Sequence, residues 1–117
     1  MDVEGRQRVA MNEATFRKVN EGMEAGQDPR GLLSFLCECG RLGCNRLMEL
    51  TRTEYEEVRT DPRTFAIIDG HEIADVEDVV ARHERYTVVR KRGAPEEDVA
   101  ESTDPRRPID SRSSSRP

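Results

Sequence analysis

The sequence is poor in the residues from which most domains build a core. It has no tryptophan, three phenylalanines and two tyrosines among 117 residues, and hydrophobic residues of all kinds make up 34%. Charged residues make up 37%, whereas about 25% is usual in globular proteins. A small chain also buries a smaller fraction of its surface than a large one. We therefore expect one thin core that is reinforced by a disulfide, a metal ion or a partner.

Long apolar segments are missing as well. No run approaches the roughly 20 apolar residues that cross a bilayer, and no positively charged start precedes an apolar stretch, as it would in a secretory signal. The three cysteines are an odd number, which disfavours a disulfide framework. We expect a cytoplasmic protein without a membrane partner, in a compartment where thiols stay reduced.

A basic stripe is also absent. The net charge is −5, and the densest basic run, residues 90–92, is best interpreted as a solvated strand end. Binding to a nucleic acid duplex depends on Lys and Arg side chains that neutralise phosphates, so we expect no nucleic acid partner. The few aromatic residues are spread along the chain, one per predicted element, which favours packing over base stacking. The expected partner is another protein.

The composition divides the chain into three parts. Residues 94–117 are rich in proline, serine and charge, and such segments bury too little apolar surface to become ordered. The sequence thus predicts a flexible N-terminus over residues 1–11, a folded domain over 12–93 and a disordered tail over 94–117.

The first half of the domain predicts a helix and a hairpin. Asn12 can cap a helix to residue 25, with Phe16, Val19 and Met23 on its buried face. A strand over residues 32–39 is expected to turn through two glycines into a second strand over 45–50. The cysteines would then lie at the tip of the hairpin.

The second half begins with the strongest local signal. Thr51 and Glu54 fit a capping box, which predicts a helix over residues 52–59, followed by an apolar strand over 65–68. Another short helix is expected from Asp75, and a last strand over 86–91. The valines at 76, 79 and 80 and His83 would share one face of that helix.

These elements predict an α+β fold. We expect a small domain with a cysteine-bearing β-hairpin, two further strands and three helices.

The three cysteines form one compact motif. Cys37, Cys39 and Cys44 have the spacing C-x-C-x4-C, and residues two apart on a strand point the same way. Three cysteines within eight residues of a glycine-bearing turn are hard to explain as core residues. They predict a Zn²⁺ site, because structural zinc is held by four sulfur or nitrogen ligands.

The fourth ligand must come from another part of the chain, which has only two histidines. His71 follows the turn at residues 69–70, in a loop from which it can reach a neighbouring hairpin tip. His83 is the alternative, although a place on the apolar face of a helix is more typical of a core histidine. We expect His71 to complete the site, so the predicted fold is a small zinc-stapled α+β domain.

Four motifs follow one another along the chain: N-E-x-x-F-R-x-V-N-E at residues 12–21, C-E-C-x4-C at 37–44, L-T-x-x-E-Y-E-x-V-R at 50–59 and G-H-E at 70–72. Together they resemble a family of small uncharacterised actinobacterial proteins. The resemblance covers about residues 12–91 and implies no particular activity. The chain departs from the family pattern at residues 41–43, within the turn, but keeps all three cysteines.

No catalytic constellation emerges from the sequence, so we expect no enzyme. The leading hypothesis is a zinc-stabilised interaction or regulatory module. The alternative is a thiol redox sensor, in which oxidation of Cys37, Cys39 and Cys44 expels the metal.

Overall fold

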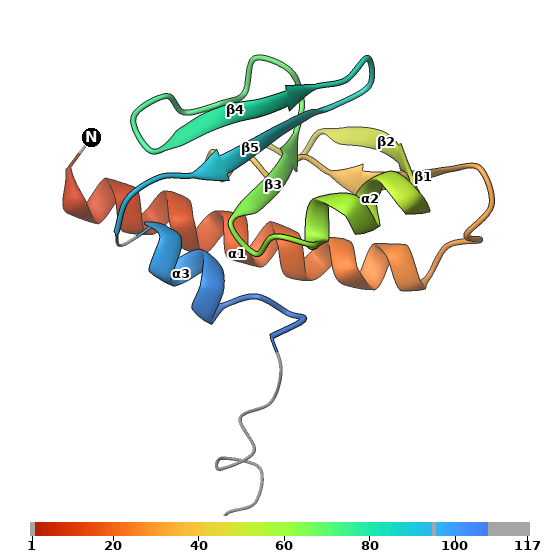
Figure 1. Ribbon diagram of the computed structural model, residues 1–117, viewed down its shortest axis with the longest axis horizontal. Helices are drawn as coiled ribbons and strands as arrows, with labels where there is room; N and C mark the ends of the chain where they lie inside the picture. The colour runs from red at the N-terminus through yellow and green to blue at the C-terminus, as the bar shows by residue number, and fades with distance from the viewer. Residues whose placement is uncertain (1, 95, 108–117) are drawn as a thin grey trace, which may run out of the picture.

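A long helix supports two small sheets. The computed structural model describes residues 2–94 and 96–107. Helix α1 (Val3–Ala25) runs along one side of the molecule. The strands lie above it in the view of Figure 1, whereas the last helix, in blue, lies at its lower side. The predicted α+β class is confirmed, because the described residues contain three helices and two antiparallel sheets. None of these helices combines the length and apolar character that a membrane span requires.

The first sheet is the predicted hairpin, with shorter strands than expected. Strand β1 (Leu32–Leu36) pairs with β2 (Leu47–Thr51), from Leu32 opposite Thr51 to Leu36 opposite Leu47. Regular pairing ends before the first cysteine. All three cysteines therefore lie in the connection over residues 37–46.

Helix α2 (Arg52–Arg59) has the predicted bounds. The Glu54 amide donates to the Thr51 hydroxyl at 3.1 Å, and the Thr51 amide donates to the Glu54 carboxylate at 2.7 Å. This reciprocal pair is the predicted capping box, which satisfies amides that the first helical turn leaves without partners.

The second sheet corrects the prediction of a helix after Asp75. It contains β3 (Thr64–Ile67), β4 (Glu77–Arg82) and β5 (Thr87–Lys91) in the order β3-β5-β4. The register of β4 shifts between Val79 and Ala81, so Val80 is an extra residue in the strand. The strand still alternates between inner and exposed side chains, and Val80 is exposed. The valines at 76, 79 and 80 therefore have helical spacing without sharing a face, and valine favours strands.

The prediction of a flexible N-terminus is wrong for residues 3–11, which belong to α1. Asp2 caps this helix, since its carboxylate accepts a hydrogen bond from the Gly5 amide at 2.6 Å. Asp is among the preferred N-cap residues. The helix therefore begins about nine residues earlier than Asn12.

The buried face of α1 is polar. Glu13, Arg17 and Asn20 are almost fully buried, whereas Val19, expected inside, is 43% exposed. Glu13 lies 2.9 Å from the ammonium of Lys91 on β5, which also pairs with Glu77 at 3.0 Å. Burial raises the pKa of Glu13 well above its usual value, although Lys91 opposes the shift. Buried polar and titratable side chains thus occupy part of the interior that apolar side chains would otherwise fill.

The predicted disordered tail contains a helix. Helix α3 (Glu96–Ser102) packs against α1, and the Arg17 guanidinium donates to the carbonyl of Ala100 at 2.7 Å. Glu96 is buried in an ion pair with Arg6. These contacts with α1 order a segment that has few apolar residues. Residue 95 and residues 108–117 of the predicted tail lie outside the described residues.

The apolar core has two parts that meet at β3, whose four residues are all buried. Phe35 stacks on Tyr55 in the first part, with ring centroids 4.2 Å apart. The second part lies under the cysteine connection and consists of Cys37, Cys39, Phe65, Ile67, Val89 and Ala100.

Candidate metal centre

The Cys37-Glu38-Cys39 segment joins the two sheets. The Cys37 amide donates to the carbonyl of Arg46 at 2.9 Å, which extends the hairpin, and the Glu38 amide donates to the carbonyl of Ala66 on β3 at 2.9 Å. The Ile68 amide also donates to the Cys37 sulfur at 3.2 Å. The segment is therefore fixed from both sides, and Cys37 and Cys39 are buried.

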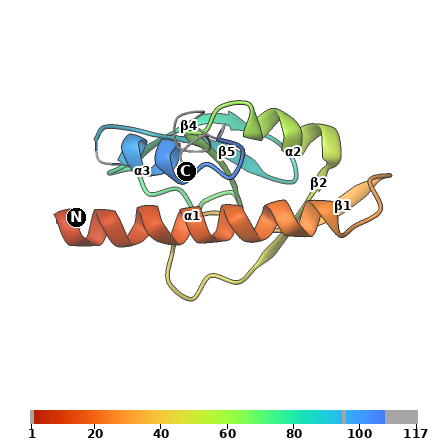
Figure 2. The same ribbon diagram turned by 90° about the horizontal axis from the view of Figure 1, so that it is seen from below.

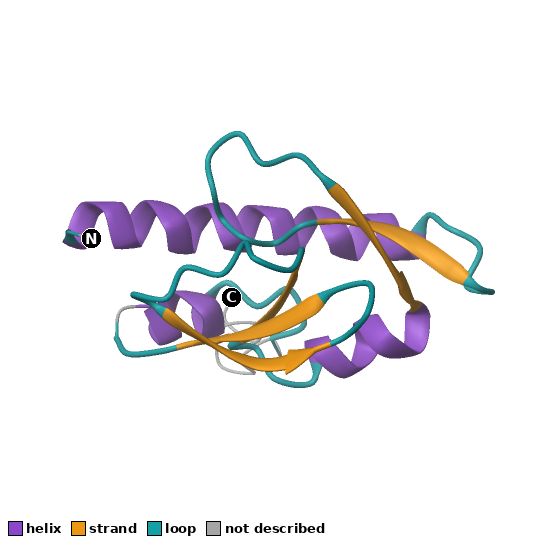
Figure 3. Cartoon of the chain, turned by 90° about the horizontal axis from the view of Figure 1, so that it is seen from above, coloured by secondary structure: helices purple, strands orange, loops and turns teal. Residues whose placement is uncertain are grey.

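The other two candidate ligands follow glycines in the left-handed region. Gly43 has φ of +85° and precedes Cys44, and Gly70 has φ of +87° and precedes His71. Glycine adopts such angles without steric cost, so the backbone turns sharply just before each of these two ligands. Figures 2 and 3 show the connection after β1 extending past α1, on the side away from α2 and α3.

The structure brings together the four residues that the sequence predicts as ligands. One ligand atom from each of Cys37, Cys39, Cys44 and His71 lies within 4.8 Å of the others. The His71 Nδ1 atom is 3.5 Å from the Cys37 sulfur and 3.7 Å from the Cys44 sulfur. Cys37 and Cys39 are buried, while Cys44 and His71 are half-buried.

His83, the alternative ligand, is not part of this cluster. It lies in the exposed turn between β4 and β5, where its ring stacks on Tyr86 with centroids 4.4 Å apart. Its expected place on a buried helix face is wrong because the segment forms a strand and turn.

The cluster distributes protons unevenly between neighbouring thiols. A hydrogen bond with Cys37, aided by the backbone amide of Arg41, lowers the pKa of Cys39 to about 5, although burial opposes the shift. The same hydrogen bond and burial raise the pKa of Cys37. A thiolate is the form of cysteine that binds metals, so Cys39 provides a charged ligand near neutral pH.

Glu38, between the two buried cysteines, anchors their segment in the interior of the protein. It is not among the site residues predicted from the sequence. Its carboxylate is fully buried and accepts hydrogen bonds from Arg59 at 3.0 Å, Asn20 at 2.8 Å and the Ala66 amide at 3.0 Å. The alternation of side chains in C-E-C could have identified it, because two cysteines that face one way leave Glu38 facing the other.

The turn after Cys39 packs tightly on α1. Gly40 has φ of +75°, and a Cβ atom there would lie 2.6 Å from the Glu13 side chain and 2.8 Å from the Val9 carbonyl oxygen. The Asn12 side chain donates to the carbonyl of Gly40 at 3.1 Å. Arg41 in turn donates to the carbonyl of His71 at 3.3 Å. Helix α1 and the loop of His71 thus hold this turn from two sides.

Three sulfurs and one imidazole nitrogen form a donor set that could hold a metal ion. This is one of the usual sets of closed, four-coordinate sites. A comparison with known protein families, curated proteins and solved structures finds no match to this chain. The suspected actinobacterial family therefore stays a prediction, and the functional argument rests on the site itself.

Proposed function

We propose that Cys37, Cys39, Cys44 and His71 hold a structural zinc ion, and that the chain is a zinc-stabilised module that binds another protein. The observation that carries the proposal is the convergence of four ligand atoms within 4.8 Å. In a cytoplasmic setting the three thiols stay reduced and free to bind a metal.

The distances support a tetrahedral ion. Zinc lies about 2.3 Å from sulfur and about 2.0–2.1 Å from nitrogen, which places sulfur and nitrogen ligands about 3.6 Å apart in a tetrahedron. The two sulfur to Nδ1 distances at His71, 3.5 Å and 3.7 Å, bracket that value. Soft thiolates also favour zinc over magnesium or calcium, which prefer oxygen ligands.

The donor count supports a structural role. Catalytic zinc usually keeps one position open for water or substrate, whereas here the protein supplies four ligands. Zinc would link the hairpin connection to the loop after β3, and so join the two sheets. Because such a site does not exist in the unfolded chain, the free energy of metal binding contributes directly to folding.

Zinc removal tests this proposal. We expect one zinc per purified chain, and we expect a strong chelator to lower the unfolding temperature by more than 10 °C. The Cys44→Ser variant should bind zinc more weakly, whereas the matched His83→Ala variant should behave as the wild type. A metal-free chain with the same unfolding temperature as the zinc-loaded chain would refute the proposal.

A second candidate function, a thiol redox sensor, is favoured by the half-buried Cys44 beside two other sulfurs. The Cys44 thiolate would attack one oxygen of hydrogen peroxide, whose O–O bond breaks. This step forms a sulfenic acid on Cys44 and releases hydroxide. The thiolate of Cys37 or Cys39 would then displace hydroxide from that sulfur to form a disulfide. Zinc release at about one equivalent of peroxide would favour the sensor, and zinc retained in excess peroxide would exclude it.

A further inference from the structure

An open groove lies between α1 and the turn that carries the candidate metal ligands. It has a volume of about 640 Å³, within the usual range of ligand pockets. One wall is formed by Gly5, Arg8, Val9 and Asn12 of α1. The last three are three, four and seven residues after Gly5, which places all four on one face of the helix. The lining residues are Gly5, Arg8, Val9, Asn12, Gly40, Arg41, Leu42 and Ile73.

The groove presents apolar surface to solvent. Leu42 is 94% exposed, more than any other large hydrophobic residue that the structure describes. It lies on the turn between Cys39 and Cys44 and lines the groove together with Val9 and Ile73. The groove therefore offers an apolar contact that residues 2–94 and 96–107 do not cover.

The charge of the groove is opposite to that of the protein. Its charged lining residues are Arg8 and Arg41, although the chain has a net charge of −5. Arg8 has no ion-pair partner among the described residues, although it also lines a neighbouring hollow together with Glu4. Arg41 is held in place, since its guanidinium donates to the carbonyls of His71 and Glu72 at 3.3 Å and 3.1 Å.

We propose that this groove binds an acidic segment of another protein that also carries an apolar side chain. The apolar side chain packs on Leu42, Val9 and Ile73, and carboxylates of the segment pair with Arg8 and Arg41. A small anion would leave the apolar wall exposed. A nucleic acid would meet only two arginines on a chain of net negative charge, too few for extensive neutralisation of phosphates.

This inference deepens the proposed function and rests on it in one respect. The turn that carries Arg41 and Leu42 lies between Cys39 and Cys44, so a bound zinc ion fixes both ends of this wall. Segment binding should therefore weaken when zinc is removed. The α1 wall does not depend on the metal.

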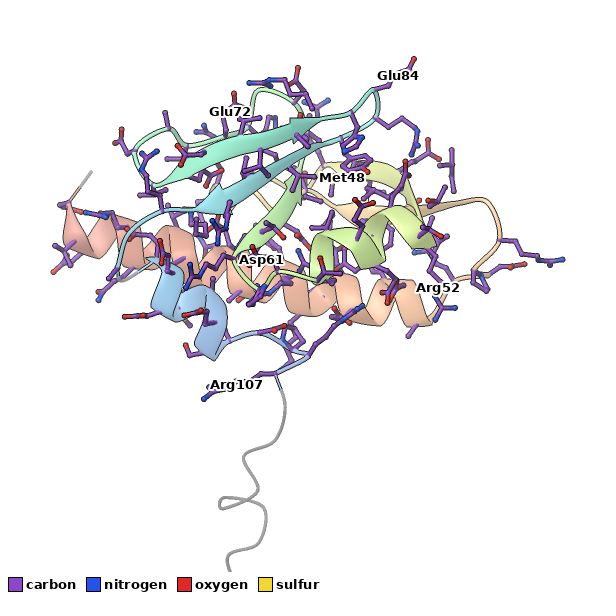
Figure 4. The ribbon with its side chains drawn as sticks, in the orientation of Figure 1. Met48, Arg52, Asp61, Glu72, Glu84 and Arg107 are labelled. Atoms are coloured by element: carbon purple, nitrogen blue, oxygen red, sulfur yellow. The ribbon has the colours of Figure 1, made fainter. Side chains whose placement is uncertain are left out.

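Panning of a random 12-residue peptide library displayed on phage against the full chain tests the groove. We expect the selected peptides to be enriched in Asp and Glu together with Leu, Ile or Phe. Their affinity should fall at least tenfold for the Arg8→Glu/Arg41→Glu double variant. The Arg52→Glu/Arg107→Glu double variant serves as the charge-matched control, because both arginines are exposed and neither lines the groove. Figure 4 shows both of them far from Glu72, whose carbonyl accepts a hydrogen bond from Arg41.

Zinc content and unfolding temperature are measured for every variant, so that loss of the fold is separated from loss of the groove. The proposal is overturned if no peptide is selected, if the selected peptides are basic, or if they bind the double variant as well as the wild type. Self-association of the chain that the double variant abolishes would identify a second copy as the occupant and also overturn it. If the protein as purified contains no zinc and still selects acidic peptides, the zinc proposal is refuted and the groove proposal is supported.

Discussion

The close packing of Gly40 against α1 predicts a large effect of one methyl group. Gly40→Ala places an L side chain at φ of +75° and a Cβ atom 2.8 Å from the Val9 carbonyl oxygen. The left-handed conformation costs about 1–2 kcal/mol, and forcing an extra carbon into a packed site costs about 1–3 kcal/mol. We expect the free energy of unfolding to fall by about 3 kcal/mol, or roughly 12 °C in unfolding temperature.

Gly43→Ala is the matched control on the same turn. Gly43 has φ of +85° but no atom within 4 Å of an added Cβ atom, so this variant should lose only about 1–2 kcal/mol for the conformation. Both variants are compared by thermal unfolding of the zinc-loaded protein. Equal losses would show that the turn does not pack on α1 as described, and would refute the reasoning.

Three further predictions concern the carboxylates and the histidines. Glu38→Ala leaves the buried Arg59 without its carboxylate partner, and it should lower the free energy of unfolding by about 3–5 kcal/mol in urea denaturation; a loss below about 1 kcal/mol would contradict the buried network. His71→Ala should weaken zinc binding at least tenfold in a competition assay with a chromophoric chelator, whereas His83→Ala should not, and equal affinities would remove His71 from the site. Burial and a hydrogen bond with Glu56 raise the pKa of Glu24 from 4.5 to about 7. Between these two pH values the folded chain retains a proton that the unfolded chain loses, so the free energy of unfolding should fall as the pH rises from about 4.5 to about 7. Glu24→Gln should make this fall with pH smaller, and an unchanged pH dependence would refute the shift.

The sequence predicts elements well where the signal is local. The capping box of Thr51 and Glu54 defines the start of α2 through backbone contacts that four residues contain. The sequence predicts helices and strands poorly where contacts with distant residues determine the structure. Residues 3–11 and 96–102 have few large apolar residues, and they become helical where Arg6 pairs with Glu96 and Arg17 reaches Ala100.

Strand β4 shows a different limit. Val76, Val79 and Val80 have the spacing of a helix face, but in the structure Val76 is buried and Val80 is exposed, so they do not share one face. Pairing with β5 determines that this segment is a strand and not a helix, and the local sequence pattern does not reveal that pairing.

The grouping of the candidate metal ligands could be predicted because it depends on few alternatives. Three cysteines within eight residues and two histidines leave a short search, and His71 follows a glycine turn. The buried charge cluster around Lys91 could not be predicted in the same way. Glu13 on α1, Glu77 on β4 and Lys91 on β5 are far apart in sequence, and only the tertiary fold brings these charges together.

X-ray absorption at the zinc edge of the purified protein tests the central claim most directly. The account predicts one zinc per chain, with three sulfur ligands near about 2.3 Å and one nitrogen ligand near about 2.0 Å. A zinc-free protein, or a bound zinc surrounded mainly by oxygen, would contradict it.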